Sequence, residues 1–413
     1  MALPLETQAD MPGHDPDFMS REFSYDPFPV LAEYRNSRPV YRHQTSQIPC
    51  ISLFRHQDIA RVLKDDKRYK MLLPGSVYTG FGSRSFYLDP PVHTGIRQYL
   101  NPQFGHSRLL RITEPVSNKC RRLLLQYANS GCFDFYTEVA VPLSVFALCE
   151  FMGLPHQDTD RITEWGRIAS KNEMSASCSP GQMPDADEKL DRSYWETGNY
   201  VSELFNRPGE GDTEEDGLLD AFHSVLKEKR NDMNREVLID ISVMLITAGF
   251  DAIAMAMCNL LRSFIEHPDQ WRLLEQDHSL INPAVEEGLR HLHPNKIMYR
   301  IAARHTSIHG VELDPGDNIL VWLGSANRDE EIFKDPDKFN IQRQQPIRHI
   351  GFGAGIHACI GAALSRLELQ SMLQVLLDLR LNFKPGDEDW WEPVVCPMMF
   401  GPDACKIILS GRK

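Results

Sequence analysis

Cys359 is the residue whose surroundings most clearly indicate chemistry. It lies in the segment FGAGIHACIG, residues 352–361, just before an apolar helical run. Glycines in such a turn let the backbone approach a flat ligand closely. A helix that begins just after a cysteine favours the thiolate, the form that attacks electrophiles and ligates metals. A lone cysteine is more often an inert core residue, but this setting predicts a thiolate that binds a metal.

The same segment carries a resemblance to a known family. Phe352, Gly355, His357, Cys359 and Gly361 match the haem loop of the cytochrome P450 family residue for residue, Leu364 and Arg366 extend the match, and Ser365 stands where that family usually has alanine. The resemblance implies haem b as cofactor, Cys359 as the axial ligand of its iron, and dioxygen as co-substrate, with no bound flavin. Phe352, Gly353 and Gly361 are then expected to shape the proximal side of the haem. A thiolate ligand favours cleavage of the O–O bond at haem iron.

Haem carries two propionates, so a haem site needs cationic or hydrogen-bonding side chains placed for them. His93 and Arg97 are one helical turn apart in the segment HTGIR, which follows DPP at 89–91. This spacing resembles the H-T-x-x-R motif of the family, on the helix that crosses the haem edge. The resemblance implies Arg300 and His357 as the other two propionate contacts.

Glu287 and Arg290 are three residues apart on an expected helix, so their opposite charges share one face. In isolation such a pair is usually an ordinary surface ion pair. The segment EGLR nevertheless resembles the family's E-x-x-R motif, and Arg343 resembles the arginine that completes the buried network of that motif. The resemblance implies that these three residues are structural and do no chemistry.

Residues 248–252, AGFDA, align with the central-helix segment that in this family usually ends in an acid followed by threonine. By resemblance, Ala248 and Gly249 leave space above the iron, and Asp251 is the relay acid. Ala252 has no hydroxyl group and cannot bind dioxygen or pass a proton. Ala252 is therefore either simply a good helix former or a sign that protons arrive from ordered water, from the substrate or from another side chain.

The resemblance also places a substrate pocket. Its expected residues are Arg84, Phe86, Tyr87, Asn295, Lys296, Met298 and Met399. Arg84 and Lys296 would hold an anionic group of the substrate, although Lys296 could equally extend its amine to water. The resulting hypothesis is a medium-sized, partly polar substrate that can bear a carboxylate.

The elements that must position these residues are mainly helices. Apolar periodicity predicts helices over 113–153, 158–206, 283–293 and after Cys359, and short strands near 297–302, 307–313 and 319–323. The run 241–261 is the most apolar; a membrane span is the competing interpretation, but Gly249, Asp251 and Asn259 favour a core helix. The prediction is a mainly α protein. The resemblance extends this to a single triangular cytochrome P450 domain over 1–413, with haem between the central helix and the helix after Cys359.

Composition excludes several classes of partner. The net charge of −13, with no basic stripe, argues against nucleic acid and against anionic membranes. Residues 1–20 are a polar segment that we expect to be flexible, and we expect neither a signal peptide nor an anchor there. Nine cysteines without C-x-x-C pairs indicate neither a disulfide framework nor a zinc site, so we expect a soluble, cytoplasmic protein.

The expected function is a haem-thiolate monooxygenase that oxidises a biosynthetic intermediate, free or bound to a carrier protein. Since we expect no fused reductase, electrons would come from a separate ferredoxin or flavodoxin with its own reductase, near Arg343, Arg348 or Arg366. One alternative is a haem-thiolate enzyme for oxidative coupling, ring formation, desaturation or N-oxidation, which would tolerate Ala252 better. A remote alternative is a haem-binding protein without catalysis.

Overall fold

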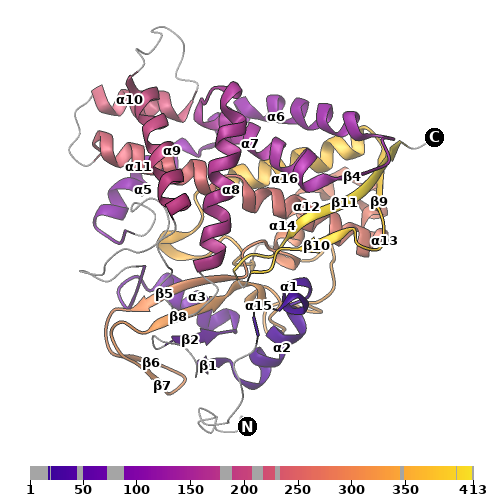
Figure 1. Cartoon of the computed structure of the whole chain (residues 1–413). Coiled ribbons are helices and arrows are strands. Elements are labelled where there is room, and N and C mark those ends of the chain that lie inside the picture. The colour runs from indigo at the N-terminus through magenta and orange to yellow at the C-terminus, as the bar shows by residue number, and fades with distance from the viewer. Residues whose placement is uncertain are drawn as a thin grey trace.

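A computed structural model describes residues 17–18, 20–43, 50–71, 88–176, 188–206, 217–227, 233–344, 348–396 and 398–411. The larger part of it is helical, and the strands gather in small sheets at its margins (Figure 1). The helices are α1 (Arg21–Tyr25), α2 (Phe28–Ser37), α3 (His56–Lys64), α5 (Val92–Gln103), α6 (His106–Tyr127), α7 (Val141–Met152), α8 (Thr159–Ala176), α9 (Glu188–Asn206), α10 (Leu218–Lys227), α11 (Arg235–Ala248), α12 (Asp251–Glu266), α13 (Pro268–Gln276), α14 (Ile281–His291), α15 (Leu323–Ala326) and α16 (Ala362–Asp378), with the short turns η2 (Tyr136–Ala140), η3 (His156–Asp158), η4 (His278–Leu280) and η6 (Gly355–His357).

Two sheets and a hairpin complete the described chain. The larger sheet has the strand order β1-β2-β8-β5-β3, in which only β2 and β8 pair in parallel. The smaller sheet joins β10, β11 and β4, with β9 also paired to β11, and β6 and β7 form the hairpin. The strands are β1 (Val40–Arg42), β2 (Cys50–Leu53), β3 (Tyr69–Lys70), β4 (Cys132–Asp134), β5 (Ile297–Ala302), β6 (Thr306–Ile308), β7 (Val311–Leu313), β8 (Asn318–Trp322), β9 (Leu381–Pro385), β10 (Trp391–Pro393) and β11 (Pro402–Gly411).

The mainly helical prediction is confirmed, but the stretch expected to be helical over 113–153 is α6, β4, η2 and α7 in turn, and the stretch 158–206 holds α8 and α9, with residues 177–187 outside the described part of the chain. Strand β5 has the expected bounds, and the segment predicted as one strand over 307–313 is instead the β6–β7 hairpin, which turns at His309 and Gly310 with positive φ. The α16 helix packs on α6 and α14, so the residues that follow Cys359 join the main hydrophobic core.

The apolar run expected as one central helix is two helices. The break falls at Gly249 and Phe250, between α11 and α12. Among the described residues, only 235–266 is long and apolar enough to cross a membrane. Thirteen residues of α12, from Asp251 to Phe264, are buried in the protein, as expected of a core helix.

Candidate functional site

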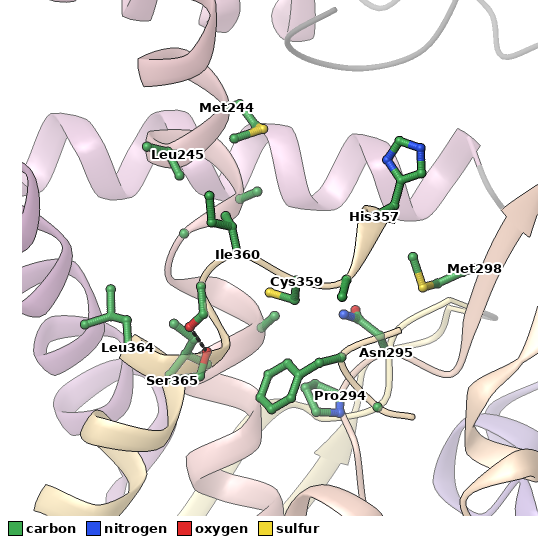
Figure 2. A pocket seen from close by; sticks show the side chains of 18 of the residues that line it. Met244, Leu245, Pro294, Asn295, Met298, His357, Cys359, Ile360, Leu364 and Ser365 are labelled. Atoms are coloured by element: carbon green, nitrogen blue, oxygen red, sulfur yellow. Dashed lines mark hydrogen bonds between the residues drawn. The ribbon is translucent and has the colours of Figure 1, made fainter. Parts of the chain in front are cut away.

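One large cavity brings most of the predicted site residues together. It has a volume of about 350 Å³ and lies between the α11–α12 junction, the loop 351–361 and the segment 293–300. Figure 2 shows the sulfur of Cys359 among side chains from α11, from the segment 294–298 and from the start of α16. Of the predicted residues, those that line it are His93, Arg97, Ala248, Gly249, Asp251, Ala252, Asn295, Met298, Arg300, Phe352, His357, Cys359, Gly361 and Met399.

The loop that carries Cys359 has a conformation that its glycines permit. Gly353 and Gly355 have φ of 71° and 75°, values that a side chain disfavours. A Cβ atom on Gly355 would also lie 2.3 Å from the carbonyl oxygen of Leu63. The backbone N–H of Cys359 donates to the carbonyl of Phe352 at 2.9 Å, which closes the loop. The loop thereby directs the thiol to the cavity rather than into the core.

Cys359 has solvent-accessible area and lines this cavity, within the protein rather than on its outer surface. Burial is the largest effect on the thiol and raises its pKa. The N–H groups of Gly361 and Ala362 and the charges of Arg97 and Arg366 act in the opposite direction but are outweighed. The helix start therefore acts on the thiol pKa in the expected direction, but burial outweighs it in the protein alone, and a bound cation would be needed to favour the thiolate.

Positive and hydrogen-bonding groups gather at one side of the cavity. Arg97 Nη2 donates to the carbonyl of Ala358 at 2.6 Å, so the α5 helix is tied to the Cys359 loop. The rings of His93 and His357 are 4.3 Å apart, and His357 Nε2 lies 3.2 Å from Asp89 Oδ1. Burial, with the nearby His357 and Arg97, lowers the pKa of His93 to about 4, so this imidazole is neutral at pH 7.

Arg300 supplies the observation that tests whether an anionic cofactor fits here. Its side chain is 1% exposed, and Nη1 donates to the carbonyl of Tyr299 at 2.7 Å. Nη2 is buried and has no hydrogen-bond partner among the described residues. Burial lowers the pKa of Arg300 only to about 10, so it stays charged. An unpaired buried guanidinium N–H at a cavity wall is costly unless a ligand accepts from it; a carboxylate-bearing cofactor such as haem fits that position and the thiol together.

The predicted structural network forms as expected. Glu287 is completely buried and accepts from Arg290 at 2.8 and 2.9 Å. Arg343 Nε lies 3.0 and 3.1 Å from the same two carboxylate oxygens. Arg290 also donates to the carbonyls of Asn327 and Pro336. A buried carboxylate held by two arginines and by backbone groups fixes the segment 327–343 against α14.

The α11–α12 junction has its own steric reason for glycine. A Cβ atom on Gly249 would lie 2.2 Å from the carbonyl oxygen of Leu245 and 2.9 Å from Leu148 Cδ1. The glycine is thus required by the packing of α11 on α7 as well as by the cavity that it lines. Ala252 lines the same cavity one turn into α12.

Asp251, the predicted relay acid, is buried and bonded on both oxygens. Tyr136 donates to Oδ1, and Ser170 donates to Oδ2. Burial and the neighbouring Asp251 raise the pKa of Tyr136 well above its usual range, so its phenol stays protonated and donates. No sequence pattern links residues 136, 170 and 251, and the sequence analysis therefore missed both hydroxyl partners.

The pocket predictions have mixed outcomes. Asn295, Met298 and Met399 line the cavity, together with Met71, Met244 and Met398, while Arg84, Phe86 and Tyr87 lie outside the described residues. Lys296 does not line it: its side chain turns to the rings of Phe23 and Phe400, with Nζ 5.1 and 5.8 Å from the two ring centroids. It is 1% exposed, so the alternative that Lys296 reaches water is also wrong.

Two of the three arginines expected at a docking surface have intramolecular partners. Arg343 binds Glu287, and Arg366 binds Glu286 at 2.5 and 3.0 Å. Arg348 is exposed. Of these three arginines, only Arg348 is left by the described contacts as an exposed side chain that a partner protein could bind.

Comparisons with known proteins agree with this geometry. The family model for cytochrome P450 matches residues 207–394, which include the Cys359 loop, Glu287, Arg290 and the α11–α12 junction. The monooxygenase PikC of Streptomyces venezuelae is 29% identical over 416 residues, covering 97% of this chain and 95% of PikC.

Solved structures show the same fold. CalO2 superimposes with a TM-score of 0.83 at 25% identity, over 95% of this chain and 98% of CalO2. The cytochrome P450 CxnD, described as the enzyme for C–S bond formation in chuangxinmycin biosynthesis, gives a TM-score of 0.80 at 25% identity, over 94% of this chain and 96% of CxnD. Residues 207–394 thus match the cytochrome P450 family, and PikC and CxnD, to which nearly the whole chain is similar, are cytochrome P450 enzymes; the chain is a monooxygenase that uses haem b and dioxygen.

Proposed function

We propose that this protein is a soluble, cytoplasmic monooxygenase in which Cys359 binds the haem iron and the cavity above it receives a biosynthetic intermediate. One observation carries the proposal: Cys359 and Arg300 line one cavity, and the buried Nη2 of Arg300 has no hydrogen-bond partner among the described residues. The first is the ligand that iron requires, and the second is a donor without an acceptor. Bound haem would supply iron for the reduction and cleavage of dioxygen.

The residues that would hold the two propionates are His93, Arg97, Arg300 and His357. All four line the cavity, and the two arginines are charged while His93 is neutral. A charged guanidinium can donate two parallel hydrogen bonds to the two oxygens of one carboxylate. Phe352 and Gly361 also line the cavity and would contact the cofactor, whereas Gly353, predicted with them, does not line it. Glu287, Arg290 and Arg343 support this site without touching the cofactor.

The reaction requires electrons from outside this domain. Bacterial relatives generally use separate redox proteins, and we propose a ferredoxin or flavodoxin with its own reductase as the donor. Arg348 is exposed close in sequence to the Cys359 loop, and Arg97 donates directly to that loop. An acidic donor protein would be attracted to such a local positive region despite the net negative charge of the chain.

The cavity favours a medium-sized, mostly uncharged substrate. Its walls are largely apolar and contain five methionines, whose flexible side chains adapt to irregular ligands. Asn295 offers an amide on the same wall. Lys296 lies against the Phe23 ring and does not line the cavity. Among the described residues, the cationic side chains of the cavity wall are therefore those assigned above to the propionates. A carboxylate-bearing substrate therefore loses its main support.

A second outcome of the same site is oxidative coupling or ring formation. Ala252 supplies no hydroxyl next to the acid, and oxygen insertion depends more strongly on ordered proton delivery than coupling does. CxnD, with the same fold, is described as forming a C–S bond. The mass of the product separates the outcomes, since only insertion adds label from labelled dioxygen.

The test begins with the purified ferric protein. We expect wild type to retain haem, to give the carbon monoxide difference spectrum of a thiolate-ligated haem on reduction, and to shift spin state with neutral members of a metabolite panel. Cys359→Ser is expected to lose that difference spectrum. If Cys359→Ser gives the same difference spectrum as wild type, Cys359 is not the ligand of the haem iron. A spin shift with carrier-bound compounds only would place the substrate on a carrier protein. If no compound of the panel is converted when a surrogate ferredoxin and reductase supply electrons, the result would favour a non-catalytic haem protein.

A further inference from the structure

The acid at the α11–α12 junction has an unusual set of partners. Asp251 is 6% exposed, and its two oxygens accept from Tyr136 and Ser170. The three residues come from η2, α8 and α12, which meet here although they are far apart in the chain. The carboxylate is thus held at both oxygens by hydroxyl groups, with no arginine or lysine paired to it among the described residues.

Only one of the two hydroxyl partners faces the cavity. Ser170 and Asp251 both line it, whereas Tyr136 is not part of its wall and is 5% exposed. Arg167, one turn before Ser170 on α8, lies 5.7 Å from the centroid of the Tyr136 ring. Tyr136 therefore holds Asp251 without lining the cavity, whereas Ser170 is the hydroxyl partner of the acid that lines the cavity itself.

The other Ser and Thr hydroxyls on the described wall are committed to backbone groups. Thr247 Oγ1 donates to the carbonyl of Val243 at 2.9 Å, within α11. Ser365 Oγ donates to the carbonyl of Gly361 at 3.1 Å, the contact drawn in Figure 2. Ser170 is the one of these three that is bonded to a carboxylate. Ala252, which follows the acid directly, has no hydroxyl.

We propose that Ser170 is the hydroxyl partner of Asp251 in proton delivery to the cavity, in place of a hydroxyl at position 252, and that Tyr136 is a positioning residue for Asp251. The inference rests on the proposed function. Asp251, once protonated from solvent, gives its proton to Ser170 Oγ while the original Ser170 proton passes to an acceptor in the cavity. One proton moves, the hydroxyl is re-formed, the carboxylate is restored, and no electron is transferred.

The first test follows electrons in the haem-loaded full chain, supplied by a surrogate ferredoxin and its reductase, with dioxygen and no organic substrate. We expect Ser170→Ala to raise the share of electrons recovered as hydrogen peroxide at least threefold and to change the solvent isotope effect, because the hydroxyl step is lost. Ser170→Thr, which keeps the hydroxyl, should restore both values. Thr163→Val is the matched control: it removes an α8 hydroxyl that donates to the carbonyl of Thr159.

The second test needs no turnover. In protein labelled with ¹³C-aspartate, the carboxylate stretching bands of Asp251 are identified by their loss in Asp251→Asn. We expect these bands to shift in Ser170→Ala and in Tyr136→Phe, and to remain near the wild-type position in Ser170→Thr and Thr163→Val. Tyr136→Phe should also change the peroxide share less than Ser170→Ala, since Tyr136 does not face the cavity.

The two proposals fail in different ways. If wild type and all variants keep the carbon monoxide spectrum while Ser170→Ala partitions electrons as wild type does, the proton role of Ser170 is refuted and the proposed function stands. Equal peroxide shares in Ser170→Ala and Ser170→Thr would also refute it, because the hydroxyl would not be the cause. Absence of haem from wild type would instead refute the proposed function.

Discussion

Lys296 gives the sharpest prediction about stability, because its buried amine has no hydrogen-bond partner among the described residues. Its side chain is 1% exposed, and Nζ has no hydrogen-bond partner among the described residues. Burial lowers the pKa of Lys296 from 10.5 to about 7. Replacement by methionine keeps the length and apolar volume of the side chain and removes the amine. We expect Lys296→Met to be more stable than wild type.

The magnitude follows from proton linkage. The folded state binds the proton less well than the unfolded state, so wild type is penalised fully below about pH 7 and gains stability as the pH rises toward 10.5. At about 1.4 kcal/mol per pH unit, the rise from pH 7 to pH 9 is worth about 3 kcal/mol. The Phe23 and Phe400 rings, 5.1 and 5.8 Å from Nζ, favour the ammonium by about 1 kcal/mol and reduce this value. The advantage of Lys296→Met at pH 6 should therefore exceed that at pH 9 by about 1–3 kcal/mol.

The assay is urea unfolding of the haem-loaded protein, followed by circular dichroism at several pH values between 6 and 9. Lys384→Met is the matched control, since Lys384 is exposed and its removal should change the free energy of unfolding by less than about 0.5 kcal/mol. An advantage of Lys296→Met that is the same at pH 6 and pH 9 would refute the linkage argument. A destabilised Lys296→Met would show that the amine has a partner that offsets its burial.

Three further predictions concern other buried charged groups. Burial raises the pKa of Glu368 well above its ordinary 4.5, so wild type should lose stability as the pH rises above 4.5. In urea unfolding, Glu368→Gln can still accept from Ser144 and should become more stable relative to wild type by up to about 3 kcal/mol between pH 4.5 and 7. A difference in unfolding free energy between the two proteins that does not change with pH would contradict a neutral Glu368. Arg343→Ala leaves the buried Glu287 with one arginine instead of two and should cost about 3–5 kcal/mol of unfolding free energy; a loss below 1 kcal/mol would show that the pair is dispensable. Arg300→Met should speed haem transfer to apomyoglobin by about tenfold or more, since a charged hydrogen bond contributes about 1.5–3 kcal/mol, and an unchanged transfer rate would remove Arg300 from the proposed site.

The sequence predicted those parts of the site whose residues are close together in the chain or belong to a recognisable spacing. The Cys359 loop was predictable because its glycines and cysteine lie within ten residues. Glu287 and Arg290 were predictable because three residues make one turn of helix. The break at Gly249 was not predictable, because an apolar run has the same composition whether the helix continues or bends. The need for glycine at this position comes from the close approach of Leu148, on α7, which is distant in the chain.

The side chains that were wrongly predicted or missed depend on contacts between distant segments. Lys296 looked like a pocket residue because its neighbours Asn295 and Met298 line the cavity, but its own amine lies against rings from positions 23 and 400. Ser170 gave no signal in the sequence, since a serine in the middle of a helix is usually an ordinary surface residue. Its role depends on a partner 81 positions later in the chain.

Arg300 and Lys296 show how a site for a ligand differs from a cost to stability. Each is a nearly fully buried cation with a polar hydrogen that has no acceptor among the described residues. Burial without a hydrogen-bond partner is unfavourable in both cases, yet Arg300 lines a cavity that is also lined by a thiol, whereas Lys296 lies against aromatic rings and does not line that cavity. A ligand can relieve the first cost and cannot reach the second. Haem loading should therefore stabilise the protein in a way that depends on Arg300, while the effect of Lys296→Met should be the same with and without haem.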